Sequence, residues 1–331
     1  MISEGPAQPM LSTNGIGARP ACWYFFGSSR ELEGGPVSKE LLGRRLVAYR
    51  PAPGQVAVLD ARCSHLGADL GLGRVVGERL QCPFHAWEYG PDGRCVRIPG
   101  IAVVPPFARQ RAYPAIERHG QIFFFNSSQP LFPLPFFGGE RPEDFVAASP
   151  LFFRAECPWY MVAANGFDAQ HLNPIHGRAL LSPPQIDEPA PCARRIRYRS
   201  RVTGRSRYDW MLRRFVGETV EVSISNWGGS LILVTAFFRR AQSYILFSVL
   251  PVAARSSQVA MIVFLRRAAG LAGSLLAPLT LWIRQRFSRA FVAGDFEQLA
   301  GIDYNPASLV AGDRELADFF AWLTHVPRES L

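Results

Sequence analysis

Lysine is nearly absent from this sequence: Lys39 is the only one, so almost all of the 36 basic residues are arginines. Acidic residues number only 27, which gives a formal charge of +9 and an isoelectric point near 9.6. Such a charge attracts an acidic protein, an anionic substrate, a membrane surface or nucleic acid. No recognition motif accompanies the charge, so we expect no nucleic-acid binding.

Cysteine is also scarce, and its six positions lack the density of a disulfide-stapled secreted domain. The first twenty residues are rich in proline, glycine, serine and alanine and contain no apolar run typical of a signal peptide. We therefore expect a cytoplasmic protein in which residues 1–20 form a mobile arm. The cysteines are Cys22, Cys63, Cys82, Cys95, Cys157 and Cys192.

One uncharged apolar run, residues 268–283, has to be weighed as a membrane span. It has 16 residues, arginines flank it on both sides, and Pro278 interrupts it. A span needs about 20 apolar residues, and proline disturbs a helix interior. We expect a buried or interfacial helix, with possible peripheral membrane contact.

Hydrophobic residues make up 48% of the chain, enough to bury a substantial core. From residue 23 to about 125, short apolar segments alternate with turns, which predicts a small all-β domain over 21–130. Residues 126–150 are rich in proline, phenylalanine and glycine and are the expected linker. The expected strands are 46–49 paired with 56–59, 87–89 paired with 94–96 across Gly90-Pro91-Asp92-Gly93, and 121–125.

The second half, residues 131–331, has a different pattern. A helix is expected first, then a run of strands, then helices again, which predicts an α+β domain. The expected helices are 160–176, 281–299 and 314–323, and the expected strands are 219–227, 230–240, 244–252 and 257–266.

Two Cys/His pairs stand close together in the N-terminal half: Cys63 with His65, and Cys82 with His85. Each pair places a thiolate and an imidazole on one loop, and two such loops can close on one metal centre. A structural zinc site also uses two cysteines and two histidines, but Cys-x-His is tighter than the usual zinc spacing. Two thiolates on one iron and two imidazoles on the other is the pattern of a Rieske cluster.

The surrounding residues make the resemblance specific. Cys63-Ser64-His65-Leu66-Gly67 and Cys82-Pro83-Phe84-His85-Ala86-Trp87 resemble the Rieske domain of aromatic-ring-hydroxylating oxygenases, in their catalytic α subunit. The resemblance implies a [2Fe–2S] cluster that accepts electrons from a ferredoxin or an NAD(P)H-dependent reductase. It also implies that a helix-grip catalytic domain follows the Rieske domain. Leu66 departs from the pattern, since many family members have arginine there.

A glycine-rich segment between the two pairs, Gly71 to Gly77, looks superficially like a dinucleotide fingerprint. Its third glycine lies one residue further along the chain than in the fingerprint G-x-G-x-x-G, and no βαβ pattern surrounds the segment. Nicotinamide, if used, is expected on a separate reductase.

A second group of candidate metal ligands lies near the start of the second half of the chain. His171 and His176 follow Asp168 closely, and two histidines with one carboxylate form the facial triad of non-haem Fe(II) oxygenases. Asp168-x-x-His171-x4-His176 resembles the motif of the same oxygenase α subunits. The resemblance puts the third ligand far downstream, at Asp295, with Glu297 and Asp303 as rivals.

The same resemblance gives Asp168 a different role from ligation. It implies a homotrimer in which Asp168 links His171 to a Rieske histidine of the neighbouring subunit. It also puts Asn165 near the iron as a polar pocket residue, although an amide that only packs the helix is an equal alternative.

Four arginines alternate with other residues near position 200. Period two places all of them on one face of a strand, either as a solvated face or as a docking surface for an acidic ferredoxin. They are Arg195, Arg197, Arg199 and Arg201.

The combined expectation is an O₂-dependent oxygenase that hydroxylates or otherwise monooxygenates a bulky apolar substrate. The 24 phenylalanines and the apolar run before Asp295 favour such a substrate. A cis-dihydroxylating dioxygenase or a demethylase is the alternative within the family. Two alternatives come from other functional classes: a Rieske electron-transfer protein and a zinc-stapled binding module. The intact pair His171/His176 argues against the electron-transfer protein.

Overall fold

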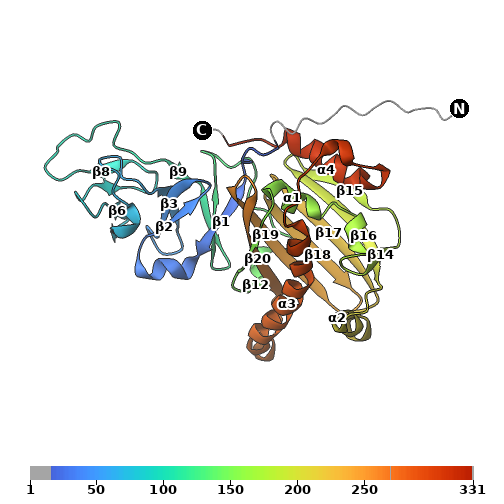
Figure 1. Cartoon of the computed structure of the whole chain (residues 1–331). Coiled ribbons are helices and arrows are strands. Elements are labelled where there is room, and N and C mark those ends of the chain that lie inside the picture. The colour runs from blue at the N-terminus through green and yellow to red at the C-terminus, as the bar shows by residue number, and fades with distance from the viewer. Residues whose placement is uncertain (1–15, 269, 330–331) are drawn as a thin grey trace.

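The computed structural model describes residues 16–268 and 270–329. Three small antiparallel sheets form the N-terminal part, and one large sheet covered by helices forms the remainder (Figure 1). Most of the expected mobile arm lies outside the described residues. Its last five residues pack against the rest: Ile16 is buried, and Pro20 forms a bridge with Arg328.

The N-terminal sheets confirm the hairpins expected from the sequence, since β3 pairs with β4 and β7 pairs with β8. The first sheet contains β1 (Trp23–Ser28), β11 (Gln121–Phe125) and β10 (Ala115–Arg118). The second contains β2 (Val37–Leu41), β3 (Arg44–Tyr49), β4 (Ala57–Asp60) and β9 (Ala112–Tyr113). The third contains β5 (Arg74–Val76), β6 (Arg79–Gln81), β7 (Glu88–Tyr89) and β8 (Cys95–Arg97).

The large sheet is antiparallel and has nine strands in the described chain, in the order β12-β20-β19-β18-β17-β16-β14, with β13 paired to β20 and β15 to β16. Its strands are β12 (Phe145–Ala147), β13 (Leu151–Ala155), β14 (Arg178–Leu180), β15 (Gln185–Ala190), β16 (Ala193–Val202), β17 (Thr219–Trp227), β18 (Leu231–Phe238), β19 (Gln242–Ala253) and β20 (Ser256–Arg266). Together with the helices, it confirms the expected α+β class.

Both faces of this sheet are largely buried at β18, β19 and β20, which explains why these strands are mostly apolar instead of alternating. In β18, Leu231 and Leu233 face a core shared with the N-terminal strands β1 and β11. Ile232 and Val234 point the other way, into a core formed with the helices. The first of these cores therefore joins the N-terminal part to the large sheet.

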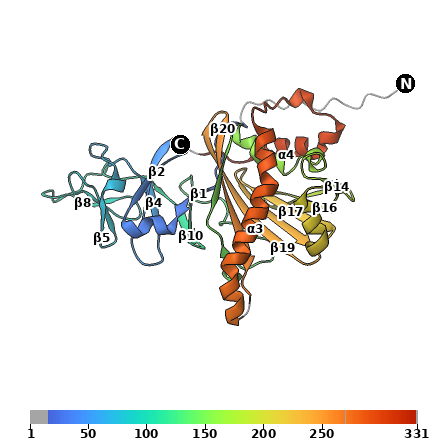
Figure 2. The same ribbon diagram turned by 60° about the horizontal axis from the view of Figure 1, so that its bottom comes forward.

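Helices cover the face of the large sheet opposite the N-terminal strands (Figure 2). They are α1 (Trp159–Asn165), α3 (Gly270–Leu299) and α4 (Arg314–His325), while α2 (Arg207–Met211) lies at one end of the sheet. The short turns are η1 (Ser29–Gly34), η2 (Leu70–Leu72), η3 (Pro142–Asp144), η4 (Gln170–Leu172), η5 (Leu212–Val216), η6 (Pro306–Ser308) and η7 (Ala311–Asp313). Among the helices of the described chain, none has the length and apolar composition needed to cross a membrane.

One expectation about local structure was wrong. The helix expected over 160–176 ends at Asn165, because Gly166 follows it and the Asp168 carboxylate then accepts the backbone N–H of Gln170 to start a new turn.

The stretch 126–150, which was expected to be the linker, packs against both parts of the molecule. Phe132 and Phe137 are buried, since these aromatic rings fill the space between the two parts.

The arginine stripe lies where period two predicted it. Along β16, Ile196, Tyr198, Ser200 and Val202 are buried and the intervening arginines point outward. Arg195 and Arg197 pair with the carboxylate of Asp187 on β15, at 2.6 and 3.1 Å. Part of this stripe is therefore neutralised within the sheet, and ferredoxin docking there remains a prediction.

His119 lies at the junction of the two parts, in the turn between β10 and β11. Its ring packs edge-on against Phe264 of the large sheet, with 5.3 Å between centroids, and its Nε2 is buried without a partner. Burial, together with the neighbouring charges of Arg118 and Arg267, lowers the pKa of His119 to about 4. The folded chain therefore keeps this imidazole neutral well below pH 6.5.

We expect this histidine to weaken the junction in acid. Between pH 6.5 and about pH 4 the unfolded chain binds a proton at His119 that the folded chain does not, so the free energy of unfolding falls as the pH falls, by about 1–3 kcal/mol. Replacing His119 with asparagine removes the titration and still tolerates the backbone φ of 52°. Melting temperatures from pH 7 to pH 4.5 should drop less in His119→Asn than in the wild type. If the melting temperatures of His119→Asn and of the wild type fall by the same amount over this pH range, His119 does not cause the loss of stability in acid.

Candidate metal centres

Two tight loops bring the four N-terminal candidate ligands together. Cys63 and His65 lie in the loop after β4, where the N–H of Gly67 donates to the carbonyl of Cys63. Cys82 and His85 lie in the loop between β6 and β7, which closes through a bond from the Cys82 N–H to the Trp87 carbonyl. Each loop thus presents one thiol and one imidazole.

Among these four side chains, the two cysteines lie deeper in the protein than the two histidines. Cys63 and Cys82 are buried neighbours, whereas the rings of His65 and His85 are exposed, with their Nδ1 atoms 3.1 Å apart. Two matching ring nitrogens that face each other above two adjoining thiols fit a binuclear centre with sulfur ligands inside and nitrogen ligands outside. The donor set therefore suits a [2Fe–2S] cluster.

The buried side of this site contains a hydrogen-bond chain that the sequence did not reveal. The hydroxyl of Tyr89 lies 3.0 Å from Cys63 Sγ and 3.0 Å from Ser64 Oγ. A metal-bound thiolate only accepts, so Ser64 donates to Tyr89 and Tyr89 donates to Cys63. On the exposed side, the ring of His65 stacks on Trp87 with 4.6 Å between centroids.

We expect Tyr89→Phe to lower the reduction potential of the cluster. A hydrogen bond to a ligand sulfur stabilises the reduced state, which carries one more negative charge. The loss should be several tens of millivolts, on the order of the 59 mV that equals tenfold for a one-electron couple. Tyr49→Phe is the matched control, because Tyr49 is buried in the same core and its hydroxyl has no partner. Equal potentials in both variants would exclude this role; spectroelectrochemical titration measures them.

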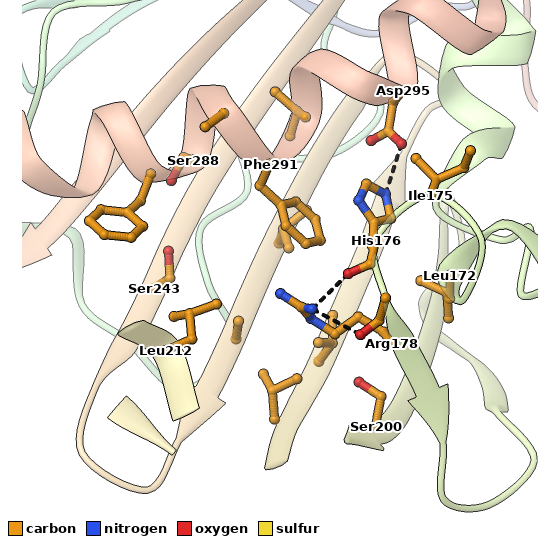
Figure 3. A pocket seen from close by; sticks show the side chains of 18 of the residues that line it. Leu172, Ile175, His176, Arg178, Ser200, Leu212, Ser243, Ser288, Phe291 and Asp295 are labelled. Atoms are coloured by element: carbon orange, nitrogen blue, oxygen red, sulfur yellow. Dashed lines mark hydrogen bonds and ion pairs between the residues drawn. The ribbon is translucent and has the colours of Figure 1, made fainter. Parts of the chain in front are cut away.

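The second candidate centre lies between the helices and the large sheet. His171 comes from η4, His176 precedes β14, and Asp295 comes from α3. One ligand atom from each lies within 4.8 Å of the other two, and no other set of three such residues in the described chain approaches this closely. His176 Nε2 is 2.8 Å from Asp295 Oδ1 (Figure 3). His171 Nε2 is 3.9 Å from the same oxygen.

One of these atoms, Asp295 Oδ1, is buried and receives no hydrogen bond from the described residues. The contact between His176 and Asp295 is short but does not have hydrogen-bond geometry, so Asp295 Oδ1 is a buried acceptor without a donor. A buried carboxylate oxygen without a donor, next to two imidazoles, fits a site in which a divalent metal binds between the three side chains. The rivals lie elsewhere: Glu297 is exposed, and Asp303 is 79% exposed and pairs with Arg255.

Two further residues hold the histidines in position. The ring of His176 stacks on Phe291, one helical turn before Asp295, with 4.1 Å between centroids. On the other side, His171 Nδ1 lies 3.6 Å from Asp168 Oδ2, while Asp168 Oδ1 accepts the N–H of Gln170. Sequence reasoning missed Phe291, although its i–4 spacing from Asp295 on a helix was a usable signal.

The cavity beside this centre has a volume of about 1000 Å³. Its walls are mainly aliphatic and aromatic side chains of β17, β18, β19 and α3, and Asn165 is among the polar residues that also line it. At its floor the buried Arg178 pairs with Asp209 at 2.7 Å and donates to the His176 carbonyl at 2.6 Å. Burial acts to raise the pKa of the Asp209 carboxyl, but bonds from Ser206 and Arg178 outweigh it and hold that pKa below its usual value. This ion pair leaves the cavity floor without net charge.

Comparison with known proteins identifies the N-terminal part. Residues 22–108 match the model of the Rieske [2Fe-2S] domain. The chain is 38% identical over 166 residues to aminopyrrolnitrin oxygenase PrnD of Pseudomonas fluorescens, a match that covers 47% of this chain and 46% of that protein. It is 40% identical over 123 residues to the oxygenase component of 3-ketosteroid-9-alpha-monooxygenase of Rhodococcus rhodochrous, covering 37% of this chain and 30% of that one. The chain therefore covers less than half the length of these relatives.

Solved structures share the whole fold. Dicamba monooxygenase bound to dicamba aligns over 93% of this chain and 97% of its own, with a TM-score of 0.70 and 18% identity. NdmA of Pseudomonas putida CBB5 aligns over 92% of this chain and 89% of its own, with a TM-score of 0.67 and 21% identity. The chain therefore contains a Rieske [2Fe-2S] domain over residues 22–108 and shares the overall fold of these two solved structures.

Proposed function

We propose that this protein is an O₂-dependent oxygenase that monooxygenates a bulky apolar substrate with electrons passed through its Rieske cluster. The observation that carries the proposal is the convergence of His171, His176 and Asp295 at the wall of a large apolar cavity, in a chain with a Rieske domain. In this proposal, Cys63, His65, Cys82 and His85 hold the cluster. The two histidines and Asp295 hold the mononuclear iron.

The metals, when bound, supply single electrons and O₂ activation. The chain supplies position and environment. Phe291 and the carboxylate of Asp168 fix the two imidazole rings, and the apolar walls exclude water from the reacting bond. The pairing of Arg178 with Asp209 removes a charge that would disfavour an apolar ligand.

The size and lining of the cavity support a large apolar molecule. A volume of about 1000 Å³ reaches the upper end of the range of small-molecule pockets. Two relatives carry names that refer to such substrates, a 3-ketosteroid monooxygenase component and a cholesterol 7-desaturase of Xenopus laevis that is 34% identical over 175 residues. We propose a polycyclic or similarly extended apolar substrate, with a ferredoxin or a reductase as electron donor.

The assembly that we propose is a homotrimer in cytoplasm, with a Rieske domain over residues 21–130 and a catalytic domain over residues 131–331. In such a ring Asp168 faces the Rieske histidines of the neighbouring subunit. Light scattering on the purified protein measures this state directly.

The test of the reaction is a labelling experiment. Protein with a chemically reduced cluster is mixed with ¹⁸O₂ and, in turn, a 3-ketosteroid, a sterol and an arylamine. We expect at least one probe to accelerate cluster reoxidation and to gain one labelled oxygen atom, and His171→Ala to abolish both effects. Two labelled atoms in one product would point to dioxygenation instead. Cluster reoxidation that is equal in the wild type and His171→Ala for every probe would contradict an oxygenase.

A further inference from the structure

The first half of α3 is an apolar helix that the protein does not cover. It extends past the edge of the large sheet, at the lower end of the molecule in Figures 1 and 2. Leu275 is 79% exposed, and Leu276, Leu279 and Trp282 are each more than half exposed. Leaving so many large apolar side chains in water along one helix marks an interaction surface.

A second element extends this apolar surface. Tyr208 and Trp210 of α2 and Phe215 of η5 are also exposed, and the ring of Tyr208 packs edge-on against Phe287 of α3 at 5.3 Å. That contact joins the two elements. We call the exposed first half of α3 together with α2 and η5 the basic apolar face.

The exposed charged side chains of α2, η5 and residues 270–294 of α3 are arginines. Arg286 and Arg289 of α3 are exposed, and Arg207 and Arg214 are exposed on α2 and η5. No aspartate or glutamate occurs between residues 266 and 294. Asp209 is the only acidic residue of α2 and η5, and it is buried with Arg178. The guanidinium of Arg286 lies 5.4 Å above the ring of Trp282.

The basic apolar face also surrounds an opening of the cavity. Residues of all three of its segments line the cavity: Tyr208 of α2, Leu212 of η5, and Ile283 and Arg284 of α3. Arg284 donates to the carbonyl of Gln242, at the turn between β18 and β19. The cavity that contains the metal centre therefore reaches the surface inside this face.

We propose that the basic apolar face binds peripherally to an anionic lipid bilayer. Leucines and tryptophan at the end of a helix suit the boundary of the acyl region, and flanking arginines suit anionic headgroups. The uniform positive charge disfavours a second copy of the same face, because like charges would meet. Insertion is shallow, since only the end of α3 projects and no helix of the described chain can span.

One consequence rests on the proposed function: an apolar substrate dissolved in the membrane would enter the cavity without passing through water. Lipid binding itself does not depend on turnover. A failure of membrane binding would therefore leave the oxygenase assignment untouched, and a failure of oxygenation would leave membrane binding untouched.

The test is vesicle flotation with the purified, cluster-loaded protein. Vesicles of phosphatidylcholine with phosphatidylglycerol are compared with vesicles of phosphatidylcholine alone, at low and at high salt. We expect binding to the anionic vesicles that weakens with salt. The double variant Leu279→Glu/Trp282→Glu should bind at least tenfold more weakly, and Arg286→Gln/Arg289→Gln should lose most of the preference for anionic lipid.

The matched control is Leu131→Glu/Val310→Glu, which adds the same charges at exposed apolar positions away from this face. It should bind like the wild type. Equal loss in both glutamate pairs, or no flotation of the wild type at low salt, would overturn the proposal. So would a change in molecular mass of the Leu279→Glu/Trp282→Glu variant with unchanged flotation, because the face would then be a contact between protein chains.

Discussion

Replacing Asp295 with alanine is expected to empty the mononuclear iron site and leave the Rieske spectrum intact. Alanine leaves two imidazoles without the carboxylate that lies 2.8 Å from His176 and 3.9 Å from His171. Two neutral nitrogen ligands hold Fe(II) poorly, so the iron-to-sulfide ratio should fall from about 1.5 to about 1. Turnover should fall with the iron. Metal analysis and the electron-paramagnetic-resonance signal of the reduced cluster measure the two centres separately.

Glu297→Ala is the control for this variant, because Glu297 lies on the same helix two residues later and is exposed. It should keep full iron content and turnover. If Asp295→Ala retains its mononuclear iron while Glu297→Ala loses it, the assignment of the third ligand is wrong.

Asp168→Asn should have an effect of a different kind: both centres stay loaded, but electrons stop passing between them. Within one chain the Rieske loops lie at the opposite end of the molecule from η4 and β14 (Figure 1). A neighbouring subunit in a head-to-tail ring could bring its cluster to the iron instead. Asp168 is suited to that junction, because Oδ2 lies beside His171 Nδ1 and its side chain is still 30% exposed.

Asparagine keeps the shape of Asp168 but removes the charge and one acceptor. Losing such a partner of a metal-bound histidine costs about 10- to 100-fold in activity. The measurement is a single turnover, in which reduced protein meets substrate and oxygen and cluster reoxidation is followed. Asp313→Asn is the control, since Asp313 also lies near this loop but bonds to the side chain of Gln170. Wild-type reoxidation in Asp168→Asn would exclude a bridge, and loss of iron would make Asp168 a ligand.

The strands were predictable wherever local sequence decides them. Residues 121–125 and 219–227 form strands with the expected bounds, because alternation and flanking turns are local signals. The run 268–283, expected to be a buried or interfacial helix, is helical from Gly270 and continues through Pro278. Whether that helix is buried or exposed was not predictable, because Leu275 and Leu279 point into solvent and the run shows no amphipathic pattern. The helix expected over 160–176 ends at Asn165, because Gly166 follows and the Asp168 carboxylate then accepts the backbone N–H of Gln170, which apolar periodicity does not reveal.

The candidate site was predictable in parts that lie close together in sequence. Cys63 and His65, or His171 and His176, form recognisable groups within a few residues. Asp295 lies more than a hundred residues away, and only a family resemblance pointed to it. The pairing of Arg178 with Asp209 and the bond of Tyr89 to Cys63 depend on tertiary packing, for which a single sequence carries no signal. The roles of the site residues stay predictions.

The core shared by the N-terminal strands and the large sheet has a mechanical consequence. Phe25 and Phe123 pack in one cluster with Leu233 and Phe264, so no hinge separates the cluster-bearing part from the iron-bearing part. The Rieske part cannot swing toward the iron as a mobile electron shuttle would. The gap between the two candidate centres is therefore fixed when the chain folds, and in the proposed homotrimer a second chain would close it. On that proposal, dilution that dissociates the trimer should abolish turnover while every subunit remains folded and keeps the colour of its cluster.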